Sequence, residues 1–239
     1  MNETEIKNKT IVKTFILIVL IIIFTVVVMY SLKRFDFVTK EYYTASDFHI
    51  KTIYSSIDYD NDALDDYSDF VLGARQDAEN HPKYVNTYYD GGYPPDNEGV
   101  CTDTVWRAFK NAGYSLKDMV NQDIVLYKED YEDIGKPDPN IDFRRVRNLK
   151  VFFNKYAISL TLDPSKIEEW QPGDIVIFRN NKHIGIISDH RNKKGIPYVI
   201  HNGGQKNREE DYLLKDEITA HYRFDASLVP EEVLIPWQE

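Results

Sequence analysis

The feature that most constrains this chain is an uninterrupted apolar stretch near its N-terminus. Residues 14–32 carry no charged side chain and are dominated by Ile, Val, Leu and Phe. In a helix that rises about 1.5 Å per residue, such a stretch spans nearly the 30 Å of a bilayer's hydrocarbon core. A cleaved signal peptide needs a small-residue cleavage site, which residues 27–31 do not offer. We therefore expect an uncleaved transmembrane anchor at 14–32, preceded by a short cytoplasmic segment at 1–13.

Size and charge indicate where the rest of the chain lies. Basic residues flank both ends of the apolar stretch, so the positive-inside rule gives little direction. An N-terminal anchor usually exports the larger part of a chain, and we expect a single-pass protein of the cell membrane whose C-terminal domain is extracytoplasmic. Residues 35–239 contain 37 acidic and 24 basic side chains, a net charge of −13. That charge argues against nucleic acid as a partner.

Beyond the anchor, the sequence predicts a stalk and one α+β domain. Residues 33–61 mix charged and aromatic side chains without clear periodicity, as in a juxtamembrane stalk. Residues 62–239 are numerous enough to bury a core of their own. Cys101 is the only cysteine in the chain, so no internal disulfide can stabilise this domain.

An acidic run at the start of this domain has two interpretations. Asp58, Asp60 and Asp62 alternate as in the opening of a calcium-binding loop, where carboxylate oxygens converge on one ion. However, Ala63 stands where such a loop needs glycine, and Asp69 stands where it needs glutamate. The alternative, which we favour, is an acidic cap on a helix from 62 to about 79. We therefore expect no cofactor, with calcium at this run as the alternative.

The lone cysteine opens a predicted amphipathic helix. Apolar side chains recur with helical spacing from Cys101 to Ala112, and Gly113 ends the pattern. The free N–H groups and the positive dipole at a helix N-terminus favour a thiolate, so we expect a lowered cysteine pKa and a reactive sulfur. The alternative is a small buried hydrophobic residue, which we favour from the helix alone. The histidines on the strands that follow reverse that preference.

Three predicted strands bring histidines toward this cysteine. Residues 174–178 and 183–189 form a hairpin around Asn180-Asn181, and residues 198–202 form a third antiparallel strand. The third strand carries His201 and Asn202 toward His183. A Cys–His pair needs a polar group to orient the imidazole, and His201, Asn202 and Asp189 are the candidates. A zinc site is less favoured, because closely spaced Cys/His pairs are missing.

Two further polar segments have open roles. In Lys136–Leu149, Arg144, Arg145 and Arg147 form either a carboxylate-binding surface or internal ion pairs with Asp138 and Asp142. His221 and Arg223, on a predicted final strand, are interpreted as structural.

Several separated motifs resemble known families. A cysteine at a helix start followed by PGDIVIF, HIGIIS and VIHN resembles the NlpC-type cysteine peptidases, a papain-like superfamily that cleaves bacterial cell-wall peptides. The segments YYDGGYPPDNEGVCTDTVWRAFKNAGYSL, KPDPNIDFRRVRNLKVFF and ITAHYRF resemble more closely the domain-of-unknown-function 1287 family, which is placed near that superfamily. The match covers roughly residues 68–224. It implies a papain-like NlpC-type fold in which the cysteine helix packs on an antiparallel sheet.

The resemblance also implies roles for individual residues. Val100 replaces the Asp that commonly precedes the cysteine, and Phe143 replaces a His expected in the closer family. The first departure weakens any transfer of substrate preference, and the second argues against a catalytic role at position 143. The implied nucleophile, general base and third polar member are Cys101, His183 and His201, with Tyr88 or Tyr89 lining the substrate site and Asp103, Asn202, Arg144 and Arg145 as supporting or substrate-binding residues.

We therefore expect a membrane-anchored extracytoplasmic cysteine hydrolase that cleaves amide bonds, with peptidoglycan peptides as the substrate class. One rival is an acyltransferase, transpeptidase or esterase on the same fold. A rival from a different class is a catalytically inert wall-binding or scaffold domain.

Overall fold

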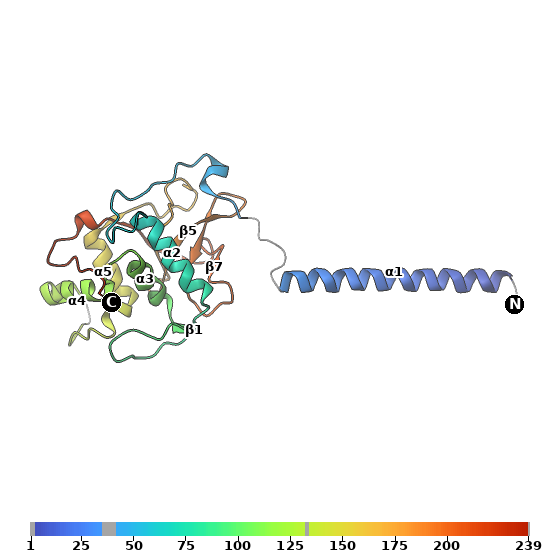
Figure 1. Ribbon diagram of the computed structural model, residues 1–239, viewed down its shortest axis with the longest axis horizontal. Helices are drawn as coiled ribbons and strands as arrows, with labels where there is room; N and C mark the ends of the chain where they lie inside the picture. Colours follow the sequence, from blue (N-terminus) through green and yellow to red (C-terminus); the bar gives the residue numbers. More distant parts are fainter. Residues whose placement is uncertain (1–2, 35–41, 132–133, 239) are drawn as a thin grey trace. The chain divides into compact units, whose positions relative to one another are not determined.

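The apolar stretch forms one long helix, α1 (Glu3–Arg34). The computed structural model describes residues 3–34, 42–131 and 134–238. Within α1, Ile11–Ser31 is long and apolar enough to cross a membrane, with a mean hydropathy of 3.1. The side chains of Ile11–Ser31 are largely exposed. Figure 1 shows α1 as one continuous helix. A signal sequence has the same composition, so the anchor and its orientation remain predictions.

The C-terminal unit, Tyr43–Glu239, is built on a six-stranded antiparallel sheet. The predicted hairpin is confirmed, because β4 (Ile175–Phe178) and β5 (His183–Arg191) pair directly and Arg179–Asn181 turn with positive φ. The third predicted strand is also confirmed, as β6 (Pro197–Ile200) pairs with β5. In spatial order the strands are β3 (Ala157–Ser159), β8 (Ile218–Phe224), β4 (Ile175–Phe178), β5 (His183–Arg191), β6 (Pro197–Ile200) and β7 (Glu209–Glu210).

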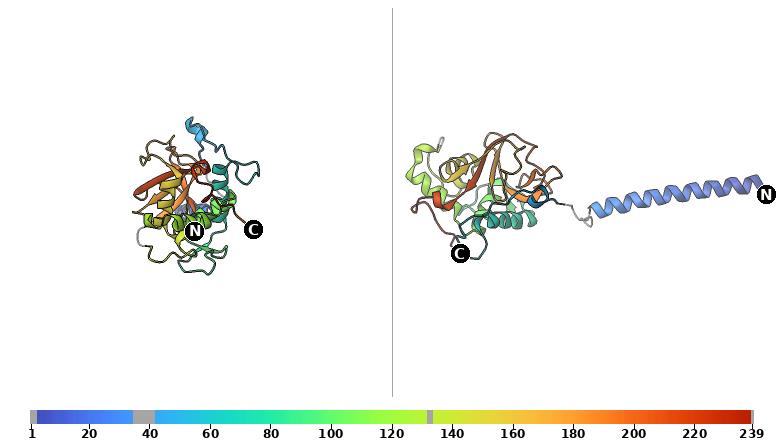
Figure 2. Two further views of the ribbon diagram at one scale, coloured as in Figure 1. Left: turned by 90° about the vertical axis from the view of Figure 1, so that its left-hand side faces the viewer. Right: turned by 90° about the horizontal axis from the view of Figure 1, so that it is seen from above.

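Among the described residues, four α-helices accompany the sheet. Three of them, α2 (Asp66–Glu79), α3 (Cys101–Asn111) and α5 (Val146–Tyr156), gather over one of its faces (Figures 1 and 2). A short parallel pair, β1 with β2, leads into α3. The helices are α2 (Asp66–Glu79), α3 (Cys101–Asn111), α4 (Leu116–Leu126) and α5 (Val146–Tyr156); the strand pair is β1 (Lys83–Tyr84) and β2 (Glu98–Gly99); and 3-10 helices cover Ala45–Phe48, Lys128–Asp130, Asp142–Arg144 and Ala226–Leu228.

Both faces of the sheet are covered, which explains its apolar sequence. Ile177 and Ile184 pack with the helices in the main core. Val176 and Phe178 alternate with them and pack on the other face, where Trp170 is fully buried. A strand buried on both sides needs apolar residues throughout rather than in alternation. The prediction of an α+β domain whose cysteine helix packs on an antiparallel sheet is confirmed at this level.

The domain begins earlier than the sequence suggested. Tyr43 forms an isolated antiparallel bridge with Arg191, while Ile57 and Tyr59 pack against the main core. Residues 43–61 therefore belong to the domain rather than to a stalk. Of the predicted stalk, residues 35–41 lie outside the described residues. The first domain helix begins at Asp66, a few residues later than predicted.

Candidate active site

Cys101 is the first residue of α3, as predicted. The segment before it is extended, and β2 delivers the chain to the helix through Val100, whose φ is −125°. The Cys101 side chain is buried, with 6% of the residue exposed. Its sulfur lies against the backbone N–H groups of Ile184, Thr102 and Cys101 itself. The contact with Ile184 places the thiol at the start of β5, one residue from His183.

The electrostatic state of the thiol differs from the prediction. Backbone N–H groups favour the thiolate, but burial opposes it more strongly and the nearby charge of Asp103 adds to the effect. Together they raise the pKa of Cys101 to about 11. The expected lowered pKa is therefore wrong for this structure, because the helix start is covered rather than open to water. The resting sulfur is a neutral thiol at physiological pH.

His183 and His201 form a hydrogen-bonded pair. Nε2 of His183 lies 2.8 Å from Nδ1 of His201, and the two rings meet edge to face at 86°. Burial lowers the pKa of His183 to about 3, helped by the neighbouring charges of His201 and Arg179. Burial also lowers the pKa of His201. Within the described residues, no hydrogen bond joins His183 to Cys101. Because Nε2 of His183 is engaged with His201, Nδ1 is the ring nitrogen without a hydrogen bond among these residues.

His201 continues the chain of polar contacts to a carboxylate. Oε1 of Glu210 lies 3.5 Å from Nε2 of His201. That contact, together with Lys215, lowers the pKa of Glu210 to about 2. The ring of Tyr212 packs against the ring of His201, with their centroids 4.2 Å apart, and this contact restricts rotation of the imidazole. Sequence analysis missed Glu210, which lies on the short edge strand β7 and carries no local motif.

Of the three candidates for the third polar member, the structure brings only His201 to His183. Asn202 donates from Nδ2 to the carbonyls of Pro82 and Gly99, and so ties the end of β6 to the segment before the cysteine. Asp189 is paired with Arg75 beyond Ser188 on β5.

Asp103 and Arg144 form a buried clamp on the cysteine helix. Arg144 donates from Nε and Nη2 to the two oxygens of Asp103 at 2.8 Å, and from Nη1 to the carbonyl of Thr87. Asp103 also accepts the N–H of Val100 at 2.7 Å, which caps the helix. Thr102 donates to the carbonyl of Arg144. Arg144 is therefore committed inside the protein and does not serve as the predicted carboxylate-binding side chain; its partner is Asp103 rather than Asp138 or Asp142.

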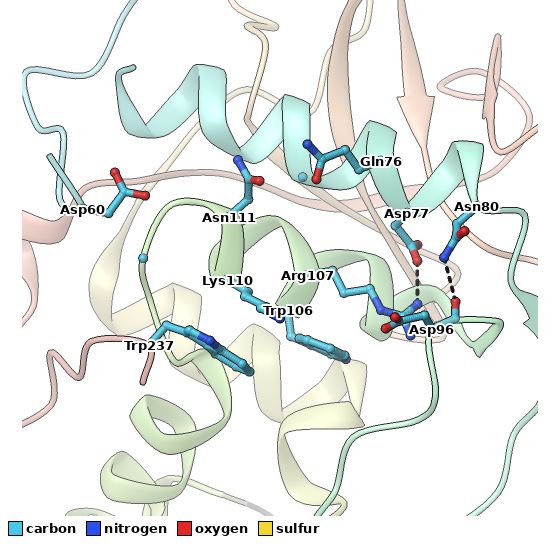
Figure 3. Close-up of a pocket in the computed structure, with 12 residues that line it drawn as sticks. Asp60, Gln76, Asp77, Asn80, Asp96, Trp106, Arg107, Lys110, Asn111 and Trp237 are labelled. Carbon is cyan, nitrogen blue, oxygen red and sulfur yellow. Dashed lines mark hydrogen bonds and ion pairs between the residues drawn. The ribbon is translucent and has the colours of Figure 1, made fainter. Parts of the chain in front are cut away.

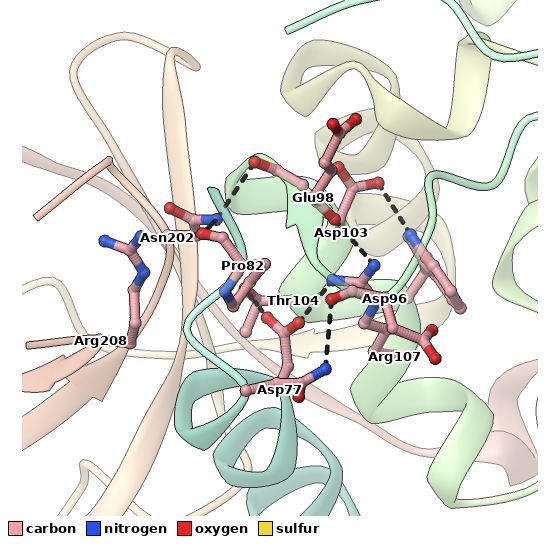
Figure 4. Close-up of polar contacts among 12 residues, drawn as sticks. Asp77, Pro82, Asp96, Glu98, Asp103, Thr104, Arg107, Asn202 and Arg208 are labelled. Carbon is pink, nitrogen blue, oxygen red and sulfur yellow. Dashed lines mark hydrogen bonds and ion pairs between the residues drawn. The ribbon is translucent and has the colours of Figure 1, made fainter. Parts of the chain in front are cut away.

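A second polar network supports the same helix from its other side (Figure 4). Thr104 donates to Asp77 on α2 at 2.7 Å, and Arg107 pairs with the same carboxylate. Arg107 also donates to the carbonyl of Glu98 on β2 at 2.9 Å. These contacts fix the cysteine helix to α2 and to the strand that precedes it, so the position of the thiol is held from three directions.

Three tyrosines lie between residues 84 and 89, ahead of the cysteine helix. Tyr84, at the end of β1, is 45% exposed, and burial, followed by the charges of Cys101 and Asp103, raises the pKa of its hydroxyl. Tyr88 donates to Asp138 at 3.4 Å, and Tyr89 donates to Glu98 at 2.7 Å. A role for Tyr88 or Tyr89 in lining the substrate site stays a prediction.

The acidic run before α2 forms a loop with its own hydrogen bonds. Ligand oxygens of Asp58, Asp60 and Asp62 lie within 4.8 Å of one another. Asp58 accepts the N–H groups of Asp62 and Ala63, and Asp62 accepts that of Leu64. The cap on α2 itself is Asp65, which accepts the N–H of Tyr67. Calcium binding at this loop remains a prediction.

A separate pocket of about 530 Å³ lies along α3, between α2 and the C-terminal segment (Figure 3). Trp106 and Trp237 stack beneath the pocket, with their ring centroids 6.2 Å apart. Nζ of Lys110 lies 4.7 Å from the centroid of the Trp237 ring. Its described lining includes neither Cys101 nor the histidine pair. We therefore assign it no part in the candidate active site.

Comparison with known proteins agrees with the motifs. The family model described as "Domain of unknown function (DUF1287)" matches residues 71–224. The chain is 37% identical over 164 residues to the uncharacterized protein YijF of Escherichia coli (strain K12), a match that covers 64% of this chain and 78% of that protein. No solved structure matches the chain significantly. The chain belongs to the domain-of-unknown-function 1287 family.

Proposed function

We propose that this protein is a membrane-anchored cysteine hydrolase of papain-like, NlpC-type fold. Its domain would lie outside the membrane and cleave amide bonds in peptidoglycan peptides. The observation that carries the proposal is the His183–His201 hydrogen bond of 2.8 Å beside a cysteine at the start of a helix. Cysteine acyl transfer needs this combination of nucleophile, base and orienting group.

The resting pair is neutral, which sets the form of the first step. With the pKa of Cys101 near 11 and that of His183 near 3, the thiol keeps its proton and the imidazole lacks a second one. The sulfur therefore loses its proton to Nδ1 of His183 as it attacks the carbonyl carbon. Hydrogen bonds between catalytic groups commonly tighten only when substrate binds, which fits the absence of a Cys101–His183 bond among the described residues.

The tautomers of the histidine pair follow from this step. If Nδ1 of His183 accepts a proton, its Nε2 carries a hydrogen and donates to Nδ1 of His201. His201 must then hold its own hydrogen on Nε2, the nitrogen that faces Glu210. Glu210 thus orients His201, and His201 orients His183. We class Glu210 as a positioning residue, because it does not touch the reacting atoms.

The remaining steps use groups at the helix start. Attack forms a carbon–sulfur bond, and the carbonyl oxygen becomes an oxyanion that backbone N–H groups at the start of α3 stabilise. The imidazolium of His183 returns its proton to the leaving amine as the amide bond breaks. Water, deprotonated by His183, then cleaves the thioester and releases the acid, and the thiol is restored.

The test uses full-length protein in detergent and soluble muropeptides, with amine release followed by mass spectrometry. Wild type should cleave them, and Cys101→Ala should lose at least 10³-fold in rate while its melting temperature stays close to that of wild type. Equal rates for the two proteins would overturn the assignment.

Alkylation by iodoacetamide tests the neutral pair independently. A thiol with pKa near 11 is thiolate about 200-fold less often at pH 8 than one with pKa 8.5, so labelling should be slow and rise about tenfold per pH unit. Fast labelling with a midpoint below 8.5 would show a preformed thiolate and contradict the proposed first step.

A further inference from the structure

A groove of about 610 Å³ with basic walls is lined in part by Lys182, the residue that precedes His183 in the chain. We call it the basic groove. One wall comes from the start of α5 and the other from the β4–β5 turn. Its lining includes Arg145, Val146, Arg147, Lys182, Thr87 and Tyr88.

The charge of the basic groove is opposite to that of the protein. The whole chain has a formal net charge of −10. Arg145 and Lys182 are both exposed, and no ion pair of either side chain occurs among the described residues. Asp138 is the acidic lining residue, and its carboxylate already accepts the N–H of Asn140 and the hydroxyl of Tyr88. The side chains of Arg145 and Lys182 are therefore available to an incoming anion.

The start of α5 has a local sequence that an isolated helix would disfavour. Arg145 occupies the N-cap, no side chain caps the helix, and no acidic residue occurs in its first turn. Cations at the positive end of a helix dipole cost free energy, whereas an anion there is stabilised by both the dipole and the side chains. A bound carboxylate would offset this cost.

The chain connects the basic groove directly to the reacting groups. Lys182 immediately precedes His183. On the other wall, Thr102, the residue after Cys101, donates to the carbonyl of Arg144, the residue before Arg145. Each wall is thus held within a residue or two of one reacting side chain, and a ligand in the groove would lie beside the bond being cut.

We propose that the basic groove binds a carboxylate of the substrate, through Arg145 and Lys182, so that the protein selects peptides with a free carboxylate near the scissile amide. Guanidinium and ammonium groups bind carboxylates by charge-assisted hydrogen bonds, and arginine does so in a bidentate way. This proposal rests on the hydrolase function proposed above, because it assumes that the bound peptide is the substrate. A binding measurement alone can test whether the groove prefers a carboxylate.

The test compares one ligand in two forms: a disaccharide-tetrapeptide muropeptide and the same molecule with its carboxylates converted to primary amides. Binding to full-length Cys101→Ala in detergent is measured by calorimetry. The free carboxylate form should bind roughly tenfold more tightly. Adding Arg145→Gln and Lys182→Gln should remove that difference, whereas Lys193→Gln with Lys194→Gln, a pair of exposed lysines elsewhere, should preserve it.

Several results would overturn the groove assignment. These are equal binding of the two forms, no binding of either, or an equal loss for both forms in the Arg145/Lys182 variant. The charge-retaining variant Arg145→Lys with Lys182→Arg keeps the test valid if the neutral variant folds poorly, since it should retain the preference.

Hydrolysis by wild type separates the two proposals. Cleavage of both forms at the same rate would support the hydrolase function and contradict carboxylate selection by the basic groove. Selective binding of the carboxylate form without cleavage would support the groove and contradict the hydrolase function.

Discussion

Two buried histidines on the same sheet are held in opposite ways. His221, on β8, has both ring nitrogens engaged: Nδ1 lies 2.8 Å from the carbonyl of Thr161, and Nε2 lies 2.9 Å from Oδ2 of Asp174. The ring of His221 stacks on the ring of Trp170, with a distance of 3.7 Å between ring centroids and an angle of 3° between the ring planes. Arg223 binds the same aspartate through two hydrogen bonds. Both ring nitrogens of His221 therefore have partners inside the protein.

His183, on β5, is just as buried but only half engaged. Nε2 binds His201, and no hydrogen bond of Nδ1 occurs among the described residues. The strand start where it lies also contacts Cys101 through the backbone of Ile184. The difference teaches that burial and a neighbouring carboxylate do not distinguish a structural histidine from a catalytic one. A spare ring nitrogen beside a nucleophile does, because acid–base chemistry needs a nitrogen free to exchange a proton.

The largest expected effect comes from exchanging each histidine for asparagine. His183→Asn should reduce muropeptide hydrolysis by about 10²- to 10⁴-fold, because the general base is lost. His221→Asn should keep the activity of its folded molecules but lose about 1–3 kcal/mol of stability, since a buried partner is left unsatisfied. Initial rates and urea unfolding measure the two effects. An inactive but well-folded His221→Asn would break the comparison.

The two carboxylates should differ mainly in stability. Asp174→Asn leaves the partly buried Arg223 without its counter-charge and removes the carboxylate partner of the buried His221, and we expect a loss of about 3–5 kcal/mol in the free energy of unfolding. Glu210→Gln, at the partly exposed edge strand, should cost less than about 1 kcal/mol. Urea unfolding at pH 7 measures both variants. Equal losses would show that Glu210 is also a structural anchor.

The sequence predicted the elements whose signals are local. Apolar length predicted a membrane-length helix at 14–32, which the structure has at Ile11–Ser31, and turn residues predicted the β4–β5 hairpin. The start of α3 at Cys101 followed from helical periodicity alone. Each of these patterns is contained within about twenty residues, where the periodicity of one element decides the outcome.

What the sequence could not predict depends on contacts between distant segments. Arg144 meets Asp103 from 41 residues away, and that partner turns a candidate substrate ligand into a clamp. The parallel pair of β1 and β2 that leads into α3 has only two residues in each strand, too few to show periodicity. The raised pKa of Cys101 has the same origin, because burial is set by β5 and not by the helix that carries the thiol.

The pH dependence of stability should reveal how completely His183 is desolvated. Its pKa is about 3 in the folded protein and about 6.5 when unfolded, so the unfolded chain binds the proton first as the pH falls. Stability from this group is complete above pH 6.5, and about 2 kcal/mol of it is lost by pH 5.

Other groups work in the opposite direction, so the comparison must be made by difference. Burial raises the pKa of Asp66 to about 6 and of Asp69 to about 7, and these groups stabilise the folded state in acid. Wild type minus His183→Asn, measured by urea unfolding at pH 7.5 and 5, isolates the histidine. A difference that does not change with pH would mean that His183 has the same pKa in the folded and unfolded protein, which would contradict its desolvation in the fold.

The smallest effect concerns the end of the polar chain. Glu210→Gln should lower kcat by about tenfold and leave KM unchanged, because an amide can donate to Nε2 of His201 and favour the wrong tautomer. Nitrogen NMR of labelled histidine should show His201 protonated on Nε2 in wild type and on both nitrogens in turn in the variant. Lys215→Gln is the matched control, since Lys215 pairs with the same carboxylate but not with the ring, and it should change kcat by less than about twofold. If the tautomer of His201 and kcat both stay unchanged in Glu210→Gln, Glu210 does not orient His201. Gln205, whose Nε2 lies 3.2 Å from Nδ1 of His201, would then be the group that sets the orientation of the ring.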